Sequence, residues 1–345
     1  MQQPPNRLSW QQLTLQLRNP FRLSYGVSDT RQVYWIRLEG DEGWGEAAIP
    51  PYYGVNPQDM IAVWQRAALS EKAFPDDPAR VAEWVGTNGP APARCALEMA
   101  LFDRIARQQN LPLYRLLQLP QPRPISTSFT IAIDTPDAMA EMARGIAGYP
   151  IIKVKLGSED DESRLAAIRA ARPDVKLRVD ANAGWTEAQS RVLIERLCRY
   201  DLEMIEQPLP REQIEAMGAL QKDCPVPITA DESVQSMNDV ERLAAAGVQA
   251  INVKLMKVGG ISAALAIFER AQALGLRIML GQMIETSIGA TAMAHFTGLA
   301  EWVDLDSPML VSNDPFEGIF YHQNAAIQLP RRAGIGVRQI GNLEE

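Results

Sequence analysis

The sequence is poor in histidine and cysteine, and both shortages narrow the chemistry that the chain can perform. Only two of its 345 residues are histidines, His295 and His322, and neither accompanies a serine or a cysteine in a catalytic pattern. His295 lies in the apolar run ATAMAHFTGL, where we expect a buried histidine with a satisfied hydrogen bond. The three cysteines have no paired spacing, so we expect no disulfide framework and no zinc knuckle, and a reducing, cytoplasmic compartment.

Long apolar runs and an excess of positive charge are also absent. No stretch approaches about 18 uninterrupted apolar residues, so we expect no membrane span. The segment MQQPPNRLSW lacks a basic region followed by an apolar run, so no secretory signal is expected. With 34 basic and 42 acidic side chains, the net charge of −8 argues against nucleic acid or an anionic membrane as a partner. We therefore expect a small-molecule partner, and the sequence is compatible with a homo-oligomer.

The first third of the chain has the pattern of an α+β domain. Three runs of alternating apolar and polar residues are separated by turn signals at Asn19-Pro20 and Gly40-Asp41, which is typical of an antiparallel meander. The proline cluster LPQPRP disfavours helix continuation and marks a linker, so we expect this domain at residues 1–122. The strand-like runs are 8–17, 32–40 and 43–49, and the helical runs are 57–74 and 91–109.

From Ile125 onward the pattern changes to an alternation of strands and helices. Apolar strand candidates are separated by mostly amphipathic helices, as parallel strands require. The sequence therefore predicts an α/β fold, a parallel (β/α) barrel over residues 123–318, with residues 319–345 returning to the N-terminal domain. The expected strands are 125–133, 151–156, 176–182, 204–208, 227–233, 250–255, 277–282 and 302–306.

Three of these strand candidates carry a carboxylate where a buried strand should carry none. Asp180, Glu206 and Asp231 recur at the spacing of one βα unit, and the carboxyl ends of barrel strands carry functional groups. Three inward carboxylates are costly unless a cation neutralises them. Hard oxygen ligands with room for water suit Mg²⁺ or Mn²⁺ better than zinc. We therefore expect one Mg²⁺ per subunit at these residues, with Mn²⁺ as a substitute.

Lysines flank the predicted metal site on both sides. Lys153 and Lys155 are two residues apart on one strand, so both point into the barrel, where each should lower the pKa of the other towards that of a usable base. Lys254 is the inward residue of INVKL, whereas Lys257 lies beyond that strand and is less suited as a base. We expect Glu232, like Glu203, to point away from the site.

Two further carboxylates, Asp304 and Asp306, lie on one face of the last predicted strand. They are outside the metal triad and would attract a cationic ligand group. The alternative is a solvated loop acid followed by a helix N-cap. Asn182 shares the face of Asp180 and could contact the metal site through water.

The motifs KVKLG, VDAN, EQP, ADES and INVKLMKVGG, in this order and spacing, resemble the muconate-lactonizing subgroup of the enolase superfamily. The resemblance implies a modified (β/α)7β barrel with an N-terminal α+β capping domain, and a lysine base with Mg²⁺ stabilising an ene-diolate. It also implies that Lys155 and Lys254 flank the substrate α-carbon on opposite faces. Mandelate racemase-like members are excluded, because GQMIETS lacks the strand histidine that they use.

Within this subgroup, Asp304-Leu305-Asp306 together with GQMIETSIG resembles the dipeptide epimerases. The resemblance implies that the two aspartates hold the α-ammonium group of a dipeptide, and that Thr130, Lys153 and Gln282 contact the substrate. It implies a Mg²⁺-dependent isomerase that inverts the α-carbon of the C-terminal residue by proton transfer between two lysines.

The sequence departs from the Ala-Glu epimerases at one position. Those enzymes carry an arginine five residues after the Phe of a Pro-Phe pair, and Gly26 stands there in this chain. A substrate ending in glutamate is therefore not expected unless Arg22 or Arg31 takes that role. Loops near 20–30 and 50–56 should set the choice of dipeptide.

Other functions are compatible with parts of the pattern. An N-acylamino acid racemase, an o-succinylbenzoate synthase or a cycloisomerase would share the metal triad and the lysines, but would have no use for the two aspartates. A Schiff-base aldolase barrel would need one lysine and no metal triad. A non-catalytic binding barrel would exchange no substrate proton.

Overall fold

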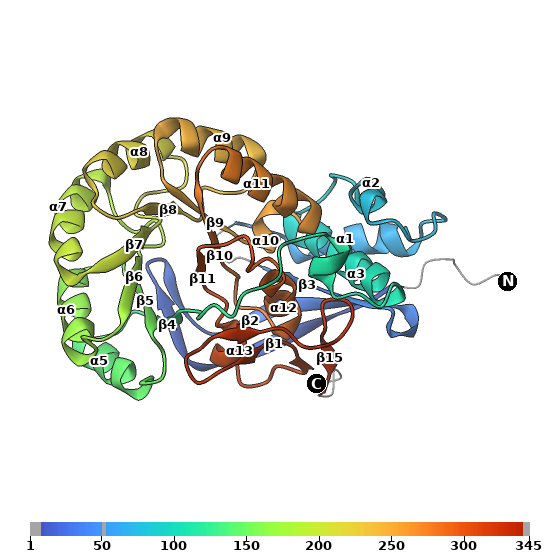
Figure 1. The fold of residues 1–345 in the computed structure, drawn as a ribbon, viewed down its shortest axis with the longest axis horizontal. Coiled ribbons are helices and arrows are strands. Elements are labelled where there is room, and N and C mark those ends of the chain that lie inside the picture. The colour runs from blue at the N-terminus through green and yellow to red at the C-terminus, as the bar shows by residue number, and fades with distance from the viewer. Residues whose placement is uncertain (1–7, 50–52, 341–345) are drawn as a thin grey trace.

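The computed structural model describes residues 8–49 and 53–340 (Figure 1). The chain begins with an antiparallel sheet in the order β1 (Leu8–Leu23), β2 (Gly26–Leu38) and β3 (Gly43–Ala48). The meander is as predicted, but the turn expected at Asn19-Pro20 is wrong, because β1 continues through it. The β1–β2 register shifts between Gln16 and Phe21. Since β1 is an edge strand, proline is tolerated there at an irregularity and no turn is needed.

Helices cover this sheet, and α3 (Ala91–Gln108) packs directly on β3. A Cβ atom at Gly45 would lie 2.0 Å from the carbonyl oxygen of Ala96, so only glycine allows this close approach. The helix predicted at 57–74 ends earlier, as α1 (Pro57–Ala68). The short helical segments of the first 122 residues are η1 (Glu39–Asp41), η2 (Pro78–Arg80), α2 (Val81–Val85) and α4 (Leu113–Leu116).

The following part of the chain forms an eight-stranded, all-parallel sheet in sequential order, curled into a barrel with helices outside it (Figure 1). Near the two ends of the sheet, Ser128 N donates a hydrogen bond to Val303 O at 3.2 Å. The strands are β4 (Phe129–Ile131), β5 (Ile151–Lys155), β6 (Lys176–Asp180), β7 (Leu202–Glu206), β8 (Ile228–Ala230), β9 (Ala250–Val253), β10 (Arg277–Leu280) and β11 (Trp302–Val303). The predicted α/β barrel is confirmed, although β4, β8 and β11 are shorter than expected.

Helical crossovers join the strands as far as β11, after which only a four-residue helix follows. This is the (β/α)7β form that the resemblance implied. The helices are α5 (Pro136–Gly145), α6 (Asp161–Ala171), α7 (Glu187–Leu197), η3 (Cys198–Tyr200), α8 (Ile214–Asp223), α9 (Met237–Ala246), α10 (Leu255–Val258), α11 (Ile261–Ala273), α12 (Ser287–Ala294) and α13 (Ser307–Leu310). None of the described helices combines the length and the apolar character that a membrane crossing requires.

The N-terminal sheet and helices are fixed to the barrel beside the predicted site. The Glu98 carboxylate accepts a hydrogen bond from Ser262 N at 2.7 Å, and a Cβ atom at Gly260 would lie 2.5 Å from it. The glycine pair before α11 therefore permits an interdomain contact as well as a tight turn. On the other side, Glu46 of β3 accepts from Thr286 N at 2.8 Å.

The C-terminal residues also contact the N-terminal domain. Ile335 N donates to Asp103 Oδ1 at 2.7 Å, and Asn313 Nδ2 donates to Thr14 O at 2.9 Å. This segment forms two short antiparallel pairs, β12 (Phe316–Glu317) with β15 (Arg338–Gln339) and β13 (Phe320–Tyr321) with β14 (Ile327–Gln328).

Candidate active site

The three predicted metal ligands meet at the carboxyl ends of adjacent strands. Asp180 ends β6, Glu206 ends β7 and Asp231 follows β8. All three side chains are fully buried, and their ligand oxygens lie within 4.8 Å of one another. Because Asp180 is the register partner of Lys155 on one side and of Glu206 on the other, these inward side chains form a single row across the barrel.

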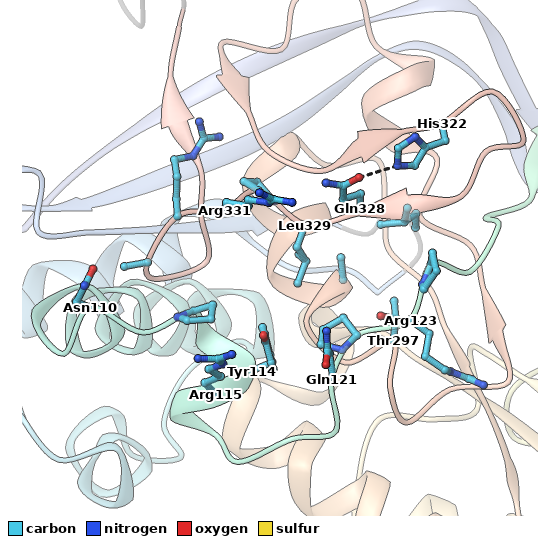
Figure 2. Close-up of a pocket in the computed structure, with 18 residues that line it drawn as sticks. Asn110, Tyr114, Arg115, Gln121, Arg123, Thr297, His322, Gln328, Leu329 and Arg331 are labelled. Atoms are coloured by element: carbon cyan, nitrogen blue, oxygen red, sulfur yellow. Dashed lines mark hydrogen bonds between the residues drawn. The ribbon is translucent and has the colours of Figure 1, made fainter.

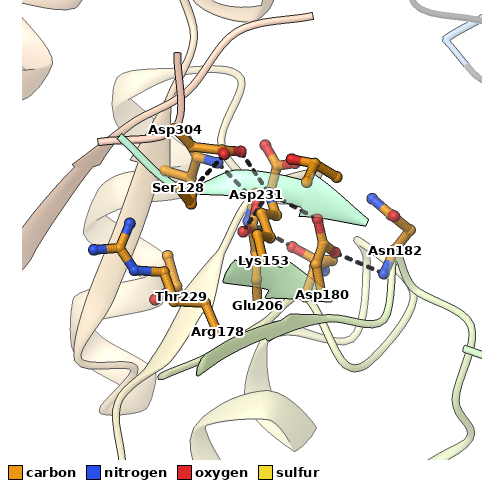
Figure 3. Close-up of polar contacts among 12 residues, drawn as sticks. Ser128, Lys153, Arg178, Asp180, Asn182, Glu206, Thr229, Asp231 and Asp304 are labelled. Carbon is orange, nitrogen blue, oxygen red and sulfur yellow. Dashed lines mark hydrogen bonds and ion pairs between the residues drawn. The ribbon is translucent and has the colours of Figure 1, made fainter. Parts of the chain in front are cut away.

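Lysine ammonium groups contact one oxygen of each carboxylate, and Figure 3 shows Lys153 among the three acids. Lys153 Nζ lies 3.0 Å from Asp180 Oδ2 and 2.8 Å from Glu206 Oε2. Lys155 Nζ lies 2.7 Å from the same Asp180 Oδ2, and Lys254 Nζ lies 2.7 Å from Asp231 Oδ2. The predicted bases are therefore paired with the predicted metal ligands.

The other oxygen of each carboxylate is held by a second donor. Asn182 N donates to Asp180 Oδ1 at 2.9 Å. Asn252 Nδ2 donates to Glu206 Oε1 at 2.8 Å. The third donor is Lys257, whose Nζ lies 2.5 Å from Asp231 Oδ1. Each ligand is thus oriented through one oxygen, while the contacts of its second oxygen with the described residues are to lysine ammonium groups.

This arrangement fits a divalent metal ion. Glu206 Oε2 is buried and accepts no hydrogen bond from the described residues, although Lys153 Nζ lies 2.8 Å away as an ion pair. Among the described residues, the buried carboxyl groups of this cluster outnumber its buried ammonium groups, and a divalent cation would balance excess negative charge. The carboxyl groups are Asp180, Glu206, Asp231, Glu232, Asp304 and Asp306, and the ammonium groups belong to Lys153, Lys155, Lys254 and Lys257.

The pKa shifts reflect the same excess of carboxylates. Burial raises the pKa of Glu206 to about 7, and the charge of Asp180 adds to this effect. We predicted that Lys153 and Lys155 lower each other's pKa, and for Lys153 this is wrong. Burial alone would lower the pKa of Lys153, but Asp180, Asp304 and Glu206 together raise it well above its usual value. The pKa of Lys254 is raised for the same reason, against the effect of burial, mainly by Asp231.

Glu232 also corrects a prediction, because its side chain faces the site. It is buried and accepts a hydrogen bond from Asn182 Nδ2 at 3.2 Å. The alternation that predicted an outward orientation ends with β8 at Ala230, so it does not apply two residues later. Burial, together with the charge of Asp231, raises the pKa of Glu232 to about 8. Glu203, in contrast, pairs with Arg178 at 2.7 Å and lies away from the triad, as predicted.

The two aspartates after β11 lie in the same buried cluster. Asp304 accepts hydrogen bonds from Ser128 Oγ at 2.6 Å and from Lys153 Nζ at 2.8 Å. Asp306 accepts from Thr130 N at 2.7 Å. The alternative of a solvated loop acid and an N-cap is therefore wrong, because both are buried and Asp306 makes no side-chain cap. Burial and the charge of Asp304 raise the pKa of Asp306 to about 7.

Above the metal triad lies a cavity of about 70 Å³, bounded by the barrel and the N-terminal sheet. The structure brings all of the other predicted site residues to its wall. They are Thr130, Lys153, Lys155, Lys254, Gln282, Asp304 and Asp306. The N-terminal domain contributes Phe21, Leu23, Tyr25, Arg31, Gln32 and Ile49.

Arg22 and Arg31 were the two candidates to take the role of the arginine that is missing at Gly26. Of these two described residues, Arg31 lines this cavity and Arg22 does not. Gly26 itself lies at the tip of the β1–β2 hairpin, where an added Cβ would meet nothing within 4 Å. Arg31 Nη1 donates to the Thr30 carbonyl at 3.0 Å. Part of the second predicted specificity loop, residues 50–52, lies outside the described residues.

His295 is a core residue, as predicted. Tyr114 N donates to its Nδ1 at 3.3 Å, and its Nε2 lies 3.1 Å from Ile335 O. Burial lowers the pKa of His295 to about 4, so the ring is neutral at physiological pH.

Comparisons with known proteins agree with this geometry. Residues 137–339 match the family described as enolase C-terminal domain-like. The L-Ala-D/L-Glu epimerase of Bacteroides thetaiotaomicron is 36% identical over 332 residues, covering 94% of this chain and 86% of that protein. The hydrophobic dipeptide epimerase of Roseobacter litoralis is 35% identical over 332 residues, covering 90% of this chain and 93% of that protein.

Among solved structures, the dipeptide epimerase of Cytophaga hutchinsonii, complexed with Mg and the dipeptide D-Ala-L-Val, superposes with a TM-score of 0.91. It is 29% identical, and the match covers 97% of this chain and 96% of that one. The chain therefore belongs to the enolase superfamily, in the group that contains the dipeptide epimerases.

Proposed function

We propose that the protein is a Mg²⁺-dependent dipeptide epimerase that inverts the α-carbon of the C-terminal residue. One observation carries this proposal. Lys155 ends β5 and Lys254 follows β9, and the three strands with the metal ligands lie between them in the sheet. Two bases on opposite sides of a metal-held substrate can remove a proton from one face and return one to the other. The names of the relatives support the same reaction.

Asp180, Glu206 and Asp231 would hold one Mg²⁺, or Mn²⁺, through the oxygens that now contact the lysines. When bound, the ion would stabilise the negative charge that develops on the substrate carboxylate. Lys153, which lies between the triad and Asp304, would neutralise the same charge from the protein side.

Lys155 and Lys254 would act as the two bases. One removes the α-proton as a neutral amine, and the other, as an ammonium group, donates a proton to the opposite face of the planar ene-diolate. In this structure each ammonium is paired with a metal ligand, and a cation in the triad would compete for those oxygens. Metal binding would thereby free both lysines to turn towards the substrate.

Asp304 and Asp306 would hold the α-ammonium group of the dipeptide, with Thr130 and Gln282 beside them in the cavity wall. The two buried carboxylates repel each other, so a cationic ligand group between them is favoured. An N-acylamino acid lacks this positive charge. The pair of aspartates therefore favours a free dipeptide as the substrate over the substrates of the related racemases.

The N-terminal sheet would contact the side chain of the residue that is inverted. Its wall is apolar at Phe21, Leu23 and Ile49 and cationic at Arg31. If Arg31 binds a carboxylate of the substrate, Arg31→Met should lower kcat/KM for a dipeptide ending in glutamate more than for one ending in leucine. Arg22→Met, at an exposed position of the same hairpin, is the matched control.

The function is tested by incubating a dipeptide library with the enzyme and Mg²⁺ in D₂O. Epimerisation adds one deuterium at the α-carbon of the C-terminal residue, which mass spectrometry detects. N-acylamino acids are included in the same preparation. A preference for N-acylamino acids over free dipeptides would refute the dipeptide assignment, and a lack of exchange in every substrate would refute the enzyme class.

We also propose the domain limits 1–122, 123–318 and 319–345 and a cytoplasmic location. The first limit is supported by the absence of regular structure between α4 and β4. The location is supported by the three cysteines, which are all free thiols.

A further inference from the structure

A second cavity, of about 580 Å³, lies between residues 110–124, which include α4 and the proline-rich linker, and the C-terminal segment. It shares no lining residue with the active-site cavity. Figure 2 shows Tyr114, Arg115 and Gln121 on one side, and Arg331, Gln328 and His322 on the other. We call it the arginine pocket. Its volume is in the range of about 300–1,000 Å³ that is usual for small-molecule sites.

The charges around the arginine pocket all have one sign. Arg115 belongs to α4 and Arg123 to the proline-rich linker, and Arg331 and Arg332 come from the C-terminal segment. Among the described residues that line it, none is an aspartate or a glutamate. This positive concave surface contrasts with the net charge of −8 of the chain.

The four arginines differ in how many hydrogen bonds and ion pairs their guanidinium groups already make within the protein. Arg332 is paired with Glu317 at 2.9 Å, and Arg123 donates one hydrogen bond to the carbonyl of Ala300 at 2.6 Å. The side chains of Arg115 and Arg331 are exposed and make no hydrogen bond or ion pair with any part of the chain that the structure describes. Two guanidinium groups are therefore fully available to a ligand, and a third is partly available.

The wall also contains the apolar residues Pro112, Ala294, Leu329 and Pro330, beside polar ones such as Gln121 and Gln328. Inorganic ions gain nothing from such a surface, whereas the carbon skeleton of an organic ligand does. Guanidinium groups bind carboxylates and phosphates through paired hydrogen bonds. The charge and the apolar wall together select an organic anion.

We propose that the arginine pocket binds a small organic anion with at least one carboxylate or phosphate group, held between Arg115 and Arg331. This ligand is distinct from the epimerase substrate, and the proposal does not depend on the reaction at the metal triad. The two possible acidic groups share the same recognition chemistry, so the test carries one probe of each.

The test is isothermal titration calorimetry of the Mg²⁺-loaded protein at an ionic strength of about 0.15 M, with succinate, glycerol 3-phosphate and uncharged glycerol as probes. At least one anion should bind, and glycerol should not. The double variant Arg115→Gln/Arg331→Gln should bind that anion about tenfold more weakly or worse, because it loses both charge-assisted contacts. A succinate response alone assigns a carboxylate site, and a glycerol 3-phosphate response alone assigns a phosphate site.

The matched control is Arg66→Gln/Arg80→Gln, which removes two exposed arginines of the N-terminal domain and changes the net charge equally. It should bind the anion within about twofold of the wild type, as charges at a distance are screened. Equal losses in both double variants would mean general electrostatic attraction and would overturn the proposal. Failure of both anions to bind, or unchanged binding in Arg115→Gln/Arg331→Gln, would overturn it as well.

Dipeptide turnover by the double variant distinguishes a failure of this proposal from a failure of the proposed function. Since neither arginine contacts the active-site cavity, Arg115→Gln/Arg331→Gln should retain dipeptide turnover while losing anion binding. If an anion competes with a dipeptide substrate and binds this variant as tightly as the wild type, it occupies the active site. That result would refute the arginine pocket as its binding site.

Discussion

Lys257 Nζ lies 2.5 Å from Asp231 Oδ1, on the opposite side of the carboxylate from Lys254. Lys257 also donates to the Asn252 carbonyl at 3.0 Å and is fully buried. It therefore fixes the rotation of Asp231 and leaves Oδ2 for a cation. The sequence marked Lys257 as the less suited base, and its position assigns it an orienting role.

Replacing Lys257 with methionine should weaken metal binding. Donors that orient metal ligands typically contribute about 10–100-fold to metal affinity, and Asp231 would lose its only donor on Oδ1 among the described residues. Calorimetric titration with Mn²⁺ measures this directly, without turnover. Lys222→Met, at an exposed lysine, is the control. If Lys257→Met binds Mn²⁺ normally but does not turn over, then Lys257 takes part in proton transfer.

Glu206→Gln should abolish turnover while keeping the fold. Burial and neighbouring carboxylates raise the pKa of Glu206 to about 7, so the neutral amide removes repulsion in the metal-free protein. Wild-type Tm should rise with Mg²⁺, because a ligand at 100 times its Kd stabilises the native state by about 2.7 kcal/mol. The Tm of Glu206→Gln should stay constant. A metal-dependent rise in the variant would remove Glu206 from the ligand set.

The two lysines should be separable by isotope exchange. Lys155→Ala and Lys254→Ala should each stop epimerisation, because inversion needs a base on both faces. Each variant should still exchange the α-proton of one stereoisomer in D₂O, and the two variants should act on opposite stereoisomers. Exchange of the same stereoisomer by both would mean that the lysines lie on one face of the substrate.

The sequence predicted the parts of the site that depend on single strands. A charged residue in a short apolar strand is conspicuous, and the spacing of Asp180, Glu206 and Asp231 identified their common position. Asp304 and Asp306 were found in the same way, from alternation within one strand.

The orientation of Glu232 and the contact of Lys257 with Asp231, both beyond strand ends, were not predicted. Glu232 follows β8 after the alternation has stopped, and Lys257 returns to Asp231 from the one-turn helix α10. The pKa of Lys153 depends on carboxylates from several strands. A pattern within one strand does not show how many carboxylates from other strands lie near its ammonium group. The turn predicted at Pro20 was wrong, because an edge strand tolerates proline. The turn propensity of proline does not show which strand lies at the edge of a sheet.

Stability should fall as the pH rises, owing to a carboxyl pair between the two domains. Burial raises the pKa of Glu46 to about 7 and that of Glu285 to about 8, and the charge of Glu46 adds to the rise for Glu285. Because their pKa is higher in the folded state, their stabilising contribution is complete at low pH and is lost as the pH rises through about 8.

Urea unfolding measures this effect. Between pH 6 and pH 8.5 the free energy of unfolding should fall by at least about 1.4 kcal/mol, the equivalent of one pKa unit. Glu285→Gln removes one charge and should flatten this dependence, while its side-chain oxygen can still accept the hydrogen bond from Met283 N. An equally steep pH dependence in the variant would place its origin elsewhere in the protein.

Asp306→Asn should lower kcat/KM for a free dipeptide steeply. If Asp306 helps to bind the substrate ammonium group, the variant leaves that charge partly unpaired in a buried site, at a cost of about 2–5 kcal/mol. The hydrogen bond that Asp306 accepts from Thr130 N can be kept by the amide oxygen of asparagine, so the local fold should remain. The loss should be much smaller for an N-acylated dipeptide, which has no ammonium group and starts as a poor substrate. Measuring both substrates with the wild type and the variant gives the coupling between Asp306 and the ammonium group. Equal losses for the two substrates would mean that Asp306 only supports Thr130 and does not bind the substrate charge.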